Sequence, residues 1–324
     1  EMLTEQIMHT SQFSMGADIG DFNNDGWGDI ISLDMLPEDP YILKSSLGED
    51  EYNLYHFKLE YGYANQYARN ALQKNNGDGT FSEIGMFAGV HATDWSWATF
   101  FMDFDNDGYK DLFISNGIER RMNDIDYANF RAGSEVRWKG NTDNLEDQDL
   151  QVVEKMPKIK LPNKFFRNSG NLKFEDVDKG VADNLPTFSN GAIYADLDND
   201  GDLEVVVNNL EDEPFIYENL SAGSAAPGNH LSLQLTGNPE NINAIGARVV
   251  VFKKQERLVS EHYTVRGFQS SALTNLHVGL GDTNAIDSIL LVWPDNTYQT
   301  LPKDGYNKTL AVQWKKGLPA FDFS

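Results

Sequence analysis

Three short stretches of the sequence place side-chain oxygens at alternate positions, which is the chemistry of a hard metal ion. They read GDFNNDGWGDI at residues 20–30, MDFDNDGYKDL at 102–112 and ADLDNDGDLEV at 195–205. Calcium takes six to eight oxygen ligands at about 2.3 to 2.6 Å, and alternate residues of a tight loop can all point toward such an ion. Counted from the first aspartate, the donors occupy positions one, three, five and nine of each loop: Asp21, Asn23, Asp25 and Asp29; Asp103, Asp105, Asp107 and Asp111; and Asp196, Asp198, Asp200 and Glu204.

Positions six and seven of the loops fit the same interpretation. Position seven holds Trp27, Tyr109 or Asp202, and such varied side chains are compatible with a ligand that is the backbone carbonyl. Position six is glycine in all three loops, which allows a sharp turn that a residue with a Cβ resists. The sequence therefore predicts up to three Ca²⁺ ions.

EF-hands and ordinary hairpin turns are the alternatives to a calcium-binding loop between strands. An EF-hand shares the first half of the pattern but needs a bidentate glutamate at position twelve and a helix on each side. Position twelve is Ser32, Ile114 or Val207, and each loop is followed by a run that reads as a strand: DIISL, DLFIS or EVVVN. Ordinary hairpin turns need only two Asp, Asn or Gly residues. Four oxygen donors in register at three places favour calcium.

The loops belong to a repeated unit of strands. Small and apolar residues precede each loop in FSMGADIG, WSWATFFM and FSNGAIYA, and the hairpin at 72–84 is similar to the one at 165–177. Each unit thus has four predicted strands, which is typical of a β-propeller blade. Inserts with helical stretches interrupt the units at residues 41–70 and 118–161. We expect further blades, from the same polypeptide or a neighbouring chain, to complete the propeller.

The pattern changes after the third unit. Blades are predicted over residues 1–220, and the small residues SAGSAAPG at 221–228 read as a linker. Residues 229–316 alternate apolar and polar side chains, which predicts a small β-sandwich, and residues 317–324 are expected to begin a further segment. The predicted fold class is all-β, a partial β-propeller with helical inserts followed by a β-sandwich.

Composition and charge limit the classes of function. The 324 residues include 50 acidic and 26 basic side chains, and a formal net charge of −24 argues against a nucleic-acid partner. The chain has no cysteine, so disulfides, thiolate metal ligands and a cysteine nucleophile are excluded. No apolar run is long enough to span a membrane, and the first ten residues lack the pattern of a signal peptide. For an exported protein, we expect the targeting segment to lie outside this sequence.

The loops, the NNGDGTF hairpin and the small-residue strands resemble FG-GAP or VCBS repeats, which build calcium-binding β-propellers, over residues 12–220. NAIGARVVVF, RGFQSSALTNLHVGLG and IDSILLVWPDN resemble the ASPIC/UnbV domain that occurs beside such repeats, over residues 229–313. LDMLPEDPY and NQYARNALQKNNGDGTFSEIG are similar to surface lipoproteins of Bacteroidetes, which are often found near SusC/SusD-type glycan importers. The resemblance implies an extracellular protein at the bacterial outer-membrane surface.

The sequence thus predicts a calcium-stabilised binding or scaffold protein whose partner is a glycan or a surface protein. A polysaccharide lyase or hydrolase is the alternative, because propellers also host enzymes, but no catalytic set converges outside the loops, and the six histidines lack metal-ligand spacing. Aromatic faces can stack on sugar rings, and the first insert concentrates tyrosines, although packing of the insert against the blades would account for them too. These candidate ligand contacts are Tyr52, Tyr55, Tyr61, Tyr63 and Tyr67.

Overall fold

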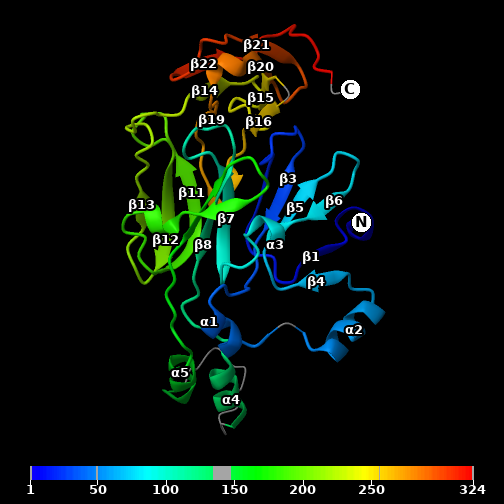
Figure 1. The fold of residues 1–324 in the computed structure, drawn as a ribbon, viewed down its shortest axis with the longest axis vertical. Coiled ribbons are helices and arrows are strands. Elements are labelled where there is room, and N and C mark those ends of the chain that lie inside the picture. Colours follow the sequence, from blue (N-terminus) through cyan, green and yellow to red (C-terminus); the bar gives the residue numbers. More distant parts are fainter. Residues whose placement is uncertain (1, 49, 134–146, 255, 323–324) are drawn as a thin grey trace.

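A computed structural model describes residues 2–48, 50–133, 147–254 and 256–322 of the chain. In these residues most of the regular structure is in antiparallel sheets, and the helices are short segments attached to them (Figure 1). The prediction of an all-β fold with propeller blades and a C-terminal β-sandwich is confirmed.

Three antiparallel sheets form the blades, and each begins with the strand that precedes an acidic loop. The inner strands β2, β7 and β11 are neighbours across the sheets, which places the three blades side by side. In the order of hydrogen-bonded neighbours, the first sheet contains β2 (Ala17–Gly20), β3 (Asp29–Ser32), β5 (Ala71–Asn75) and β6 (Phe81–Glu83); the second contains β7 (Ser96–Met102), β8 (Asp111–Asn116), β9 (Lys164–Asn168) and β10 (Phe174–Asp176); and the third contains β11 (Phe188–Ala195), β12 (Glu204–Leu210) and β13 (Phe215–Tyr217).

The second blade is apolar at successive positions because it is buried on both faces. Successive side chains of a strand point to opposite faces of its sheet. Phe101 and Leu112 accordingly join the core shared with the first blade, whereas Phe100 and Phe113 join the core shared with the third. Full burial of one such side chain contributes about 1.5 to 3 kcal/mol. Packing between blades therefore explains why WSWATFFM and DLFIS lack the alternation of a half-exposed strand.

The third sheet has three strands, so the prediction of four strands in every unit is wrong for this blade. After β13 the chain forms no further strand before β14 (His230–Thr236). The intervening residues include SAGSAAPG, whose small residues have low strand propensity and whose proline cannot donate to a ladder. The outer edge of β13 is therefore unpaired in this sheet.

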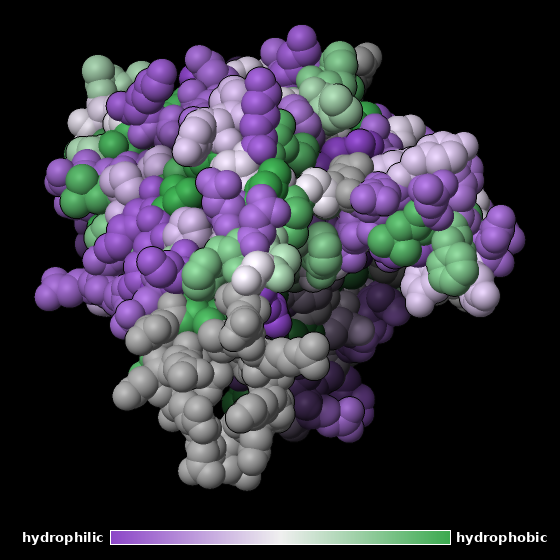
Figure 2. All heavy atoms as spheres, turned by 90° about the horizontal axis from the view of Figure 1, so that it is seen from below, coloured by the Kyte–Doolittle hydropathy of each residue, from purple (hydrophilic) through white to green (hydrophobic). Residues whose placement is uncertain are grey.

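The two inserts lie at the end of the blades opposite the sandwich (Figure 1). The first contains α1 (Pro40–Ser45), α2 (Tyr52–Glu60) and β4 (Asn65–Tyr67), and β4 pairs with β1 (His9–Ser11). The second contains α4 (Ile125–Gly133) and α5 (Asp147–Glu154), and its residues 134–146 lie outside the described residues. Figure 2 views the molecule from this end and shows hydrophobic residues exposed among hydrophilic ones.

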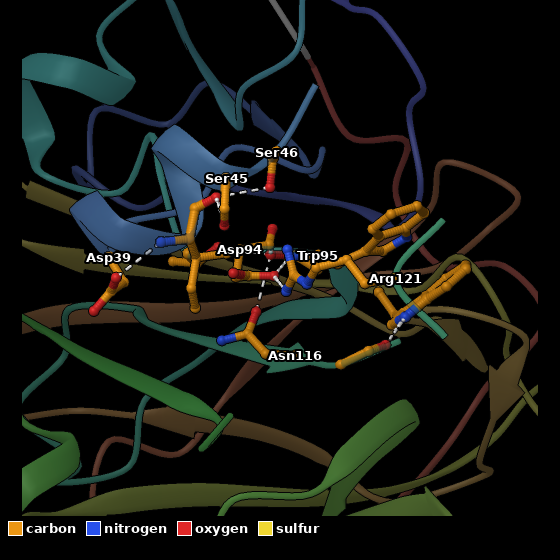
Figure 3. A network of polar contacts seen from close by, with 12 residues as sticks. Asp39, Ser45, Ser46, Asp94, Trp95, Asn116 and Arg121 are labelled. Atoms are coloured by element: carbon orange, nitrogen blue, oxygen red, sulfur yellow. Dashed lines mark hydrogen bonds and ion pairs between the residues drawn. The ribbon is translucent and has the colours of Figure 1, made fainter. Parts of the chain in front are cut away.

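A buried polar network fixes the inserts to the second blade (Figure 3). The guanidinium of Arg121, in the second insert, forms an ion pair with Asp94, and both side chains are almost fully buried. Asp94 also accepts a hydrogen bond of 2.6 Å from the backbone N–H of Trp95. Beside this pair, Asp39 caps α1 by accepting hydrogen bonds from the N–H groups of its first turn. Loss of one partner of a buried ion pair typically costs about 3 to 5 kcal/mol, so the pair of Arg121 with Asp94 holds the second insert firmly to the blade.

The C-terminal sandwich consists of two sheets that enclose one apolar core. One sheet contains β19 (Leu276–Gly279), β14 and β22 (Thr309–Gln313), and the other contains β16 (Glu256–Glu261), β15 (Arg248–Lys253), β20 (Ile286–Val292) and β21 (Tyr298–Leu301). The core includes Leu231 and Leu233 of β14, Val249 and Val251 of β15, and Trp293. A short hairpin, β17 (Val265–Arg266) and β18 (Ser270–Ser271), extends from the sandwich to β7 and β11.

No helix in the described part of the chain is long and apolar enough to cross a membrane.

Candidate metal centre

The three acidic loops lie at the end of the blades that faces the sandwich (Figure 1). Each loop connects the inner strand of a blade to the second strand: β2 to β3, β7 to β8, and β11 to β12. We name them the first loop (Asp21–Asp29), the second loop (Asp103–Asp111) and the third loop (Asp196–Glu204). Adjacent blades therefore bring three chemically similar loops next to one another.

The first aspartate of the loop organises the turn. In the first loop, Asp21 accepts hydrogen bonds from the N–H groups of Asp25 at 3.2 Å and Gly26 at 2.9 Å. Asp103 makes the equivalent bonds in the second loop at 3.1 and 2.8 Å. The glycine at position six has a φ of 91° in the first loop, a backbone conformation that favours a residue without a Cβ. The similar spacing of residues thus gives two loops with the same backbone bonds.

The acid at position nine ties the loop to its blade. Asp111 accepts hydrogen bonds from the N–H of Phe104, at 3.0 Å, and from the N–H of Asn168 on β9, at 2.8 Å. Asp29 makes the equivalent two bonds in the first loop, and Glu204 accepts one from Leu197 in the third at 2.7 Å. The loops are therefore anchored on both sides of the candidate ligands.

The last acid of each loop and Asp103 are buried close to other carboxylates, which makes their ionised forms unfavourable without a cation. Burial raises the pKa of Asp29 to about 7 and that of Glu204 to about 7. Burial and, secondly, the neighbouring charge of Asp107 raise the pKa of Asp103 to about 8. Burial also raises the pKa of Asp111 well above its ordinary value. A bound divalent cation would reverse this balance, because it stabilises the ionised carboxylates.

The geometry of the second and third loops fits a calcium ion. Ligand oxygens of Asp103, Asp105 and Asp111 lie within 4.8 Å of one another. In the third loop the same holds for Asp196, Asp198 and Glu204, and for a second group that shares Glu204 with Asp200 and Asp202. One oxygen each of Asp105, Asp196 and Asp202 is buried without a hydrogen-bond partner. An all-oxygen donor set with unpartnered buried oxygens is suited to Ca²⁺, which takes six to eight oxygen ligands.

The first loop is a weaker candidate. Its three carboxylates do not form such a group among the residues that the structure describes. The amide of Asn23, at position three, donates a hydrogen bond of 2.9 Å to Asp25. An amide at this position supplies a neutral oxygen, so this loop offers calcium less negative charge than the other two. The individual ligand assignments in all three loops stay predictions.

The third loop uses position seven differently from the first two. The sequence pattern assigns only the backbone carbonyl of Asp202 to the metal, but its side chain is fully buried. One carboxylate oxygen of Asp202 accepts hydrogen bonds from the N–H of Ala222, at 2.7 Å, and the hydroxyl of Ser221, at 3.1 Å, and the other lacks a partner. In the sequence, the signal for this additional carboxylate was an acid at position seven, where the other two loops have an aromatic residue.

A relay of asparagine side chains connects the loops of adjacent blades. At position four, the amide of Asn24 donates to the carbonyl of Gly108 in the second loop at 2.9 Å. The amide of Asn106 donates in the same way to Gly201 in the third loop at 3.0 Å. Both residues have positive φ, which asparagine tolerates better than most side chains. Asparagine at the same position of every loop was visible in the sequence, but its role depends on how the blades are packed.

The five tyrosines of the first insert fall into two groups. Tyr55 donates a hydrogen bond of 2.6 Å to Asn65, and the ring of Tyr67 contacts Arg69. These two rings help to hold the insert together, in agreement with a packing role for aromatic residues. Tyr52, Tyr61 and Tyr63 are exposed, so they remain candidates for contact with a ligand.

The fold and the loops define a class of protein, and comparison with family models agrees with it. An FG-GAP-like repeat matches residues 58–114, and an ASPIC and UnbV domain matches residues 237–319. The chain therefore combines FG-GAP-like propeller repeats with an ASPIC/UnbV domain, as the sequence resemblance implied.

Known relatives of the chain are cartilage acidic proteins. Cartilage acidic protein 1 of Homo sapiens is 26% identical over 261 residues, which cover 71% of this chain and 38% of the human protein. The proteins of the same name from Xenopus tropicalis and Mus musculus are also 26% identical, and 39% of each is covered. The chain thus spans about two fifths of the length of these relatives. The similarity to Bacteroidetes lipoproteins stays a prediction.

Proposed function

We propose that the protein is a calcium-stabilised binding or scaffold protein of a cell surface, and that its binding surface is the first insert, residues 41–70. Bound Ca²⁺ has a structural role in this proposal: it compensates the buried carboxylates of the loops and keeps the blades rigid. The insert lies at the opposite end of the blades from the loops (Figure 1). The metal and the ligand would therefore occupy separate parts of the molecule.

The exposed apolar surface of the insert carries the proposal. Helix α2 has no buried residue, although it contains tyrosine, leucine and phenylalanine. Tyr52, Leu54 and Phe57 of this helix are exposed, and Tyr61 and Tyr63 continue the surface beyond its end. Contiguous exposed apolar surface on a soluble domain typically marks a contact with another molecule. Helix α2 buries none of its apolar side chains within the chain, and contact with a partner would explain why they are there.

Protein is the favoured class of partner. Leu54 stands among the aromatic residues of α2, and Leu43 and Leu47 of the same insert are also exposed. Aliphatic side chains add apolar area to a protein interface but do not stack on sugar rings. A glycan is the second candidate, because the rings of Phe57 and Tyr61 lie 4.4 Å apart and offer an aromatic platform with a hydroxyl at its edge.

We propose an extracellular location, at the outer-membrane surface of a bacterium. Calcium sites of modest affinity are occupied most readily where calcium is abundant, as it is outside cells. Association with a SusC/SusD-type importer belongs to the same proposal, because such importers accompany the lipoproteins that the sequence resembles. Co-purification of the protein with an importer from detergent-solubilised membranes is the corresponding measurement.

Site-specific photo-cross-linking tests the proposed binding surface. A photoreactive amino acid at position 61 should capture one defined protein on the cells that produce the chain. The matched control has the same amino acid at position 220, because Leu220 is 72% exposed and Tyr61 is 69% exposed. A partner captured at position 61 alone supports the proposal, whereas equal capture at both positions, or none, contradicts a protein-binding insert.

A glycan array distinguishes the two classes of ligand. Binding to a glycan that is lost in the variant Y52S/Y61S/Y63S would transfer the role of the insert from protein to carbohydrate. Leu185, Ile216 and Leu220 are exposed apolar residues of the third blade, and L185S/I216S/L220S is therefore the control for a general loss of apolar surface. Glycan binding that neither variant changes would place the site elsewhere.

A further inference from the structure

The sandwich contacts the blades through the acidic loops, and the second loop supplies two side-chain contacts to β16. The hydroxyl of Tyr109 donates to Glu256 on β16 at 2.7 Å. The ammonium group of Lys110 donates to the carbonyl of Val259, also on β16, at 2.7 Å. The same ammonium donates to the carbonyl of Asp21 in the first loop at 3.1 Å. One turn of the chain thus connects two candidate metal loops and one strand of the sandwich.

Asn106 of the second loop adds a further contact to the sandwich. Its amide nitrogen donates to Gly201, so its oxygen is the acceptor for the ring of His277 on β19, with a distance of 2.7 Å. Burial lowers the pKa of His277 to about 3, so the ring is neutral and carries its proton on Nε2. The backbone carbonyl of Asn106 also accepts a hydrogen bond of 3.0 Å from the N–H of Gly281. This asparagine therefore links the third loop, the second loop and the sandwich.

The approach of the sandwich to the second loop is so close that it requires glycine. A Cβ at Gly279 on β19 would overlap the carboxylate of Asp103, the first candidate ligand of the loop. Both oxygens of that carboxylate already accept hydrogen bonds within the loop. Any movement of the Asp103 carboxylate would therefore change its contact with Gly279 on β19.

The sandwich also has an attachment that does not involve the loops. At the hairpin β17–β18, Arg266 forms an ion pair with Asp18 on β2 at 3.2 Å. The neighbouring ring of Phe268 packs against Trp97 on β7, with 4.9 Å between the ring centroids. This attachment lies among the inner strands of the blades and contains no candidate metal ligand. It would keep the sandwich attached to the blades when the loops lose their fixed geometry.

From these contacts we infer that calcium binding by the second loop and docking of the sandwich are coupled, so that each strengthens the other. Without the ion, the guanidinium of Arg167 pairs with Asp105 at 2.6 Å and with Asp107 at 3.6 Å, but it compensates the charge of the loop only in part. The remaining repulsion between carboxylates loosens the turn that carries Asn106, Tyr109 and Lys110. Those three residues hold the sandwich. Coupling between two binding events is reciprocal: docking of the sandwich strengthens calcium binding by the same factor as calcium strengthens docking, so a change that favours the undocked state must weaken calcium binding. The inference rests on the proposed binding of calcium by the loops.

The test is titration of calcium into the calcium-free protein by isothermal calorimetry, with the variant Tyr109→Phe. This change removes the hydroxyl that bonds Glu256 and leaves the backbone carbonyl at position seven unchanged. We expect calcium binding at one site to weaken about tenfold, within the usual range of coupling. Tyr298→Phe on β21 is the matched control, because it removes a hydroxyl from the sandwich away from the loops.

The variant Lys110→Met separates coupling from simple electrostatics. Removing a positive charge beside a calcium site strengthens calcium binding if only Coulomb interactions matter. Coupling predicts the opposite, weaker binding, because the contact with Val259 is lost. Lys316→Met, at an exposed position of the sandwich, is the control. Circular dichroism spectra of each variant establish that it is folded before its calcium isotherm is compared.

Hydrogen exchange provides a second measurement on the unaltered protein. Removing calcium should increase exchange in β16 and β19 more than in β17 and β18. If the unaltered protein binds no calcium, the proposed calcium sites are wrong. If it binds calcium, and both Tyr109→Phe and Lys110→Met bind it as tightly as their controls, the coupling is refuted while the calcium sites stand.

Discussion

After calcium has been removed, the protein should become less stable as the pH rises from about 4 to 7. In the absence of the ion, burial raises the pKa of Asp29 from its ordinary value of 3.8 to about 7. A carboxyl that holds its proton more tightly in the folded state than in the unfolded state destabilises the fold progressively over the interval between the two pKa values. The calcium-free protein should therefore be more stable at about pH 5 than at about pH 7.5.

The expected effect is large enough to measure. One pKa unit corresponds to about 1.4 kcal/mol, so the raised pKa of Asp29 lowers the free energy of unfolding by about 4 kcal/mol above pH 7. About 2.5 kcal/mol of this loss falls between pH 5 and pH 7.5. Asp103 and Glu204 act in the same direction. In a protein of this size 1 kcal/mol changes the Tm by about 2 to 4 °C, so the Tm should fall by about 5 °C or more.

Differential scanning calorimetry at the two pH values, with protein passed over a chelating resin, measures this change. Saturating calcium, at about 100 times its Kd, should add about 2.7 kcal/mol for each site and keep the coordinated carboxylates ionised. The increase in Tm caused by calcium should therefore be larger at pH 7.5 than at pH 5. A calcium-free Tm that rises with pH, with the same calcium effect at both values, would refute the reasoning from buried loop acids.

Three substitutions test individual contacts. Asp202→Asn should raise the Tm of the calcium-free protein and lower that of the calcium-loaded protein, because one like charge is removed from the third loop; equal shifts in both forms would contradict this. Arg266→Met should cost about 3 kcal/mol in urea unfolding, because it removes the cation that is paired with the buried carboxylate of Asp18, and adding Asp18→Asn should restore part of this loss. Asn106→Ala should lower the free energy of unfolding by about 2 kcal/mol more than Asn199→Ala. Both variants lose an asparagine with positive φ, but only the first loses the hydrogen bonds to Gly201 and His277. Equal losses would exclude the relay.

The repeated acidic loops and the strands beside them could be predicted from the sequence because their signals are local. Oxygen donors at alternate positions require a tight turn, and the β-branched runs after them require strands, whatever the rest of the chain does. The structure accordingly places a strand on each side of every loop, including β3, β8 and β12 after them. The division into blades and sandwich follows from the same alternation of apolar and polar residues.

Features that depend on contacts between distant segments could not be predicted in this way. The sequence RGF at 266–268 is polar, small and aromatic, and nothing local indicates that it inserts between the inner strands of the blades. The buried ion pair of Asp94 with Arg121 likewise joins residues from a blade and an insert. The parallel pairing of β22 with β14 brings together strands more than 70 residues apart. In each case the pattern of one segment is uninformative until its partner is known.

The asparagine relay gives the first and the third blade complementary hydrogen-bonding groups, an acceptor on one and a donor on the other. Asn24 donates from the first loop to the second, and Asn106 donates from the second to the third, so the interaction has a fixed direction. Asn199 occupies the same position of the third loop, has the same positive φ and is exposed, and the carbonyl of Gly26 is the equivalent acceptor on the first loop. A contact that repeats head to tail either closes into a ring or continues, and each added hydrogen bond contributes about 1 kcal/mol. A further blade beside the first or the third would find these hydrogen-bonding groups in position to continue the relay.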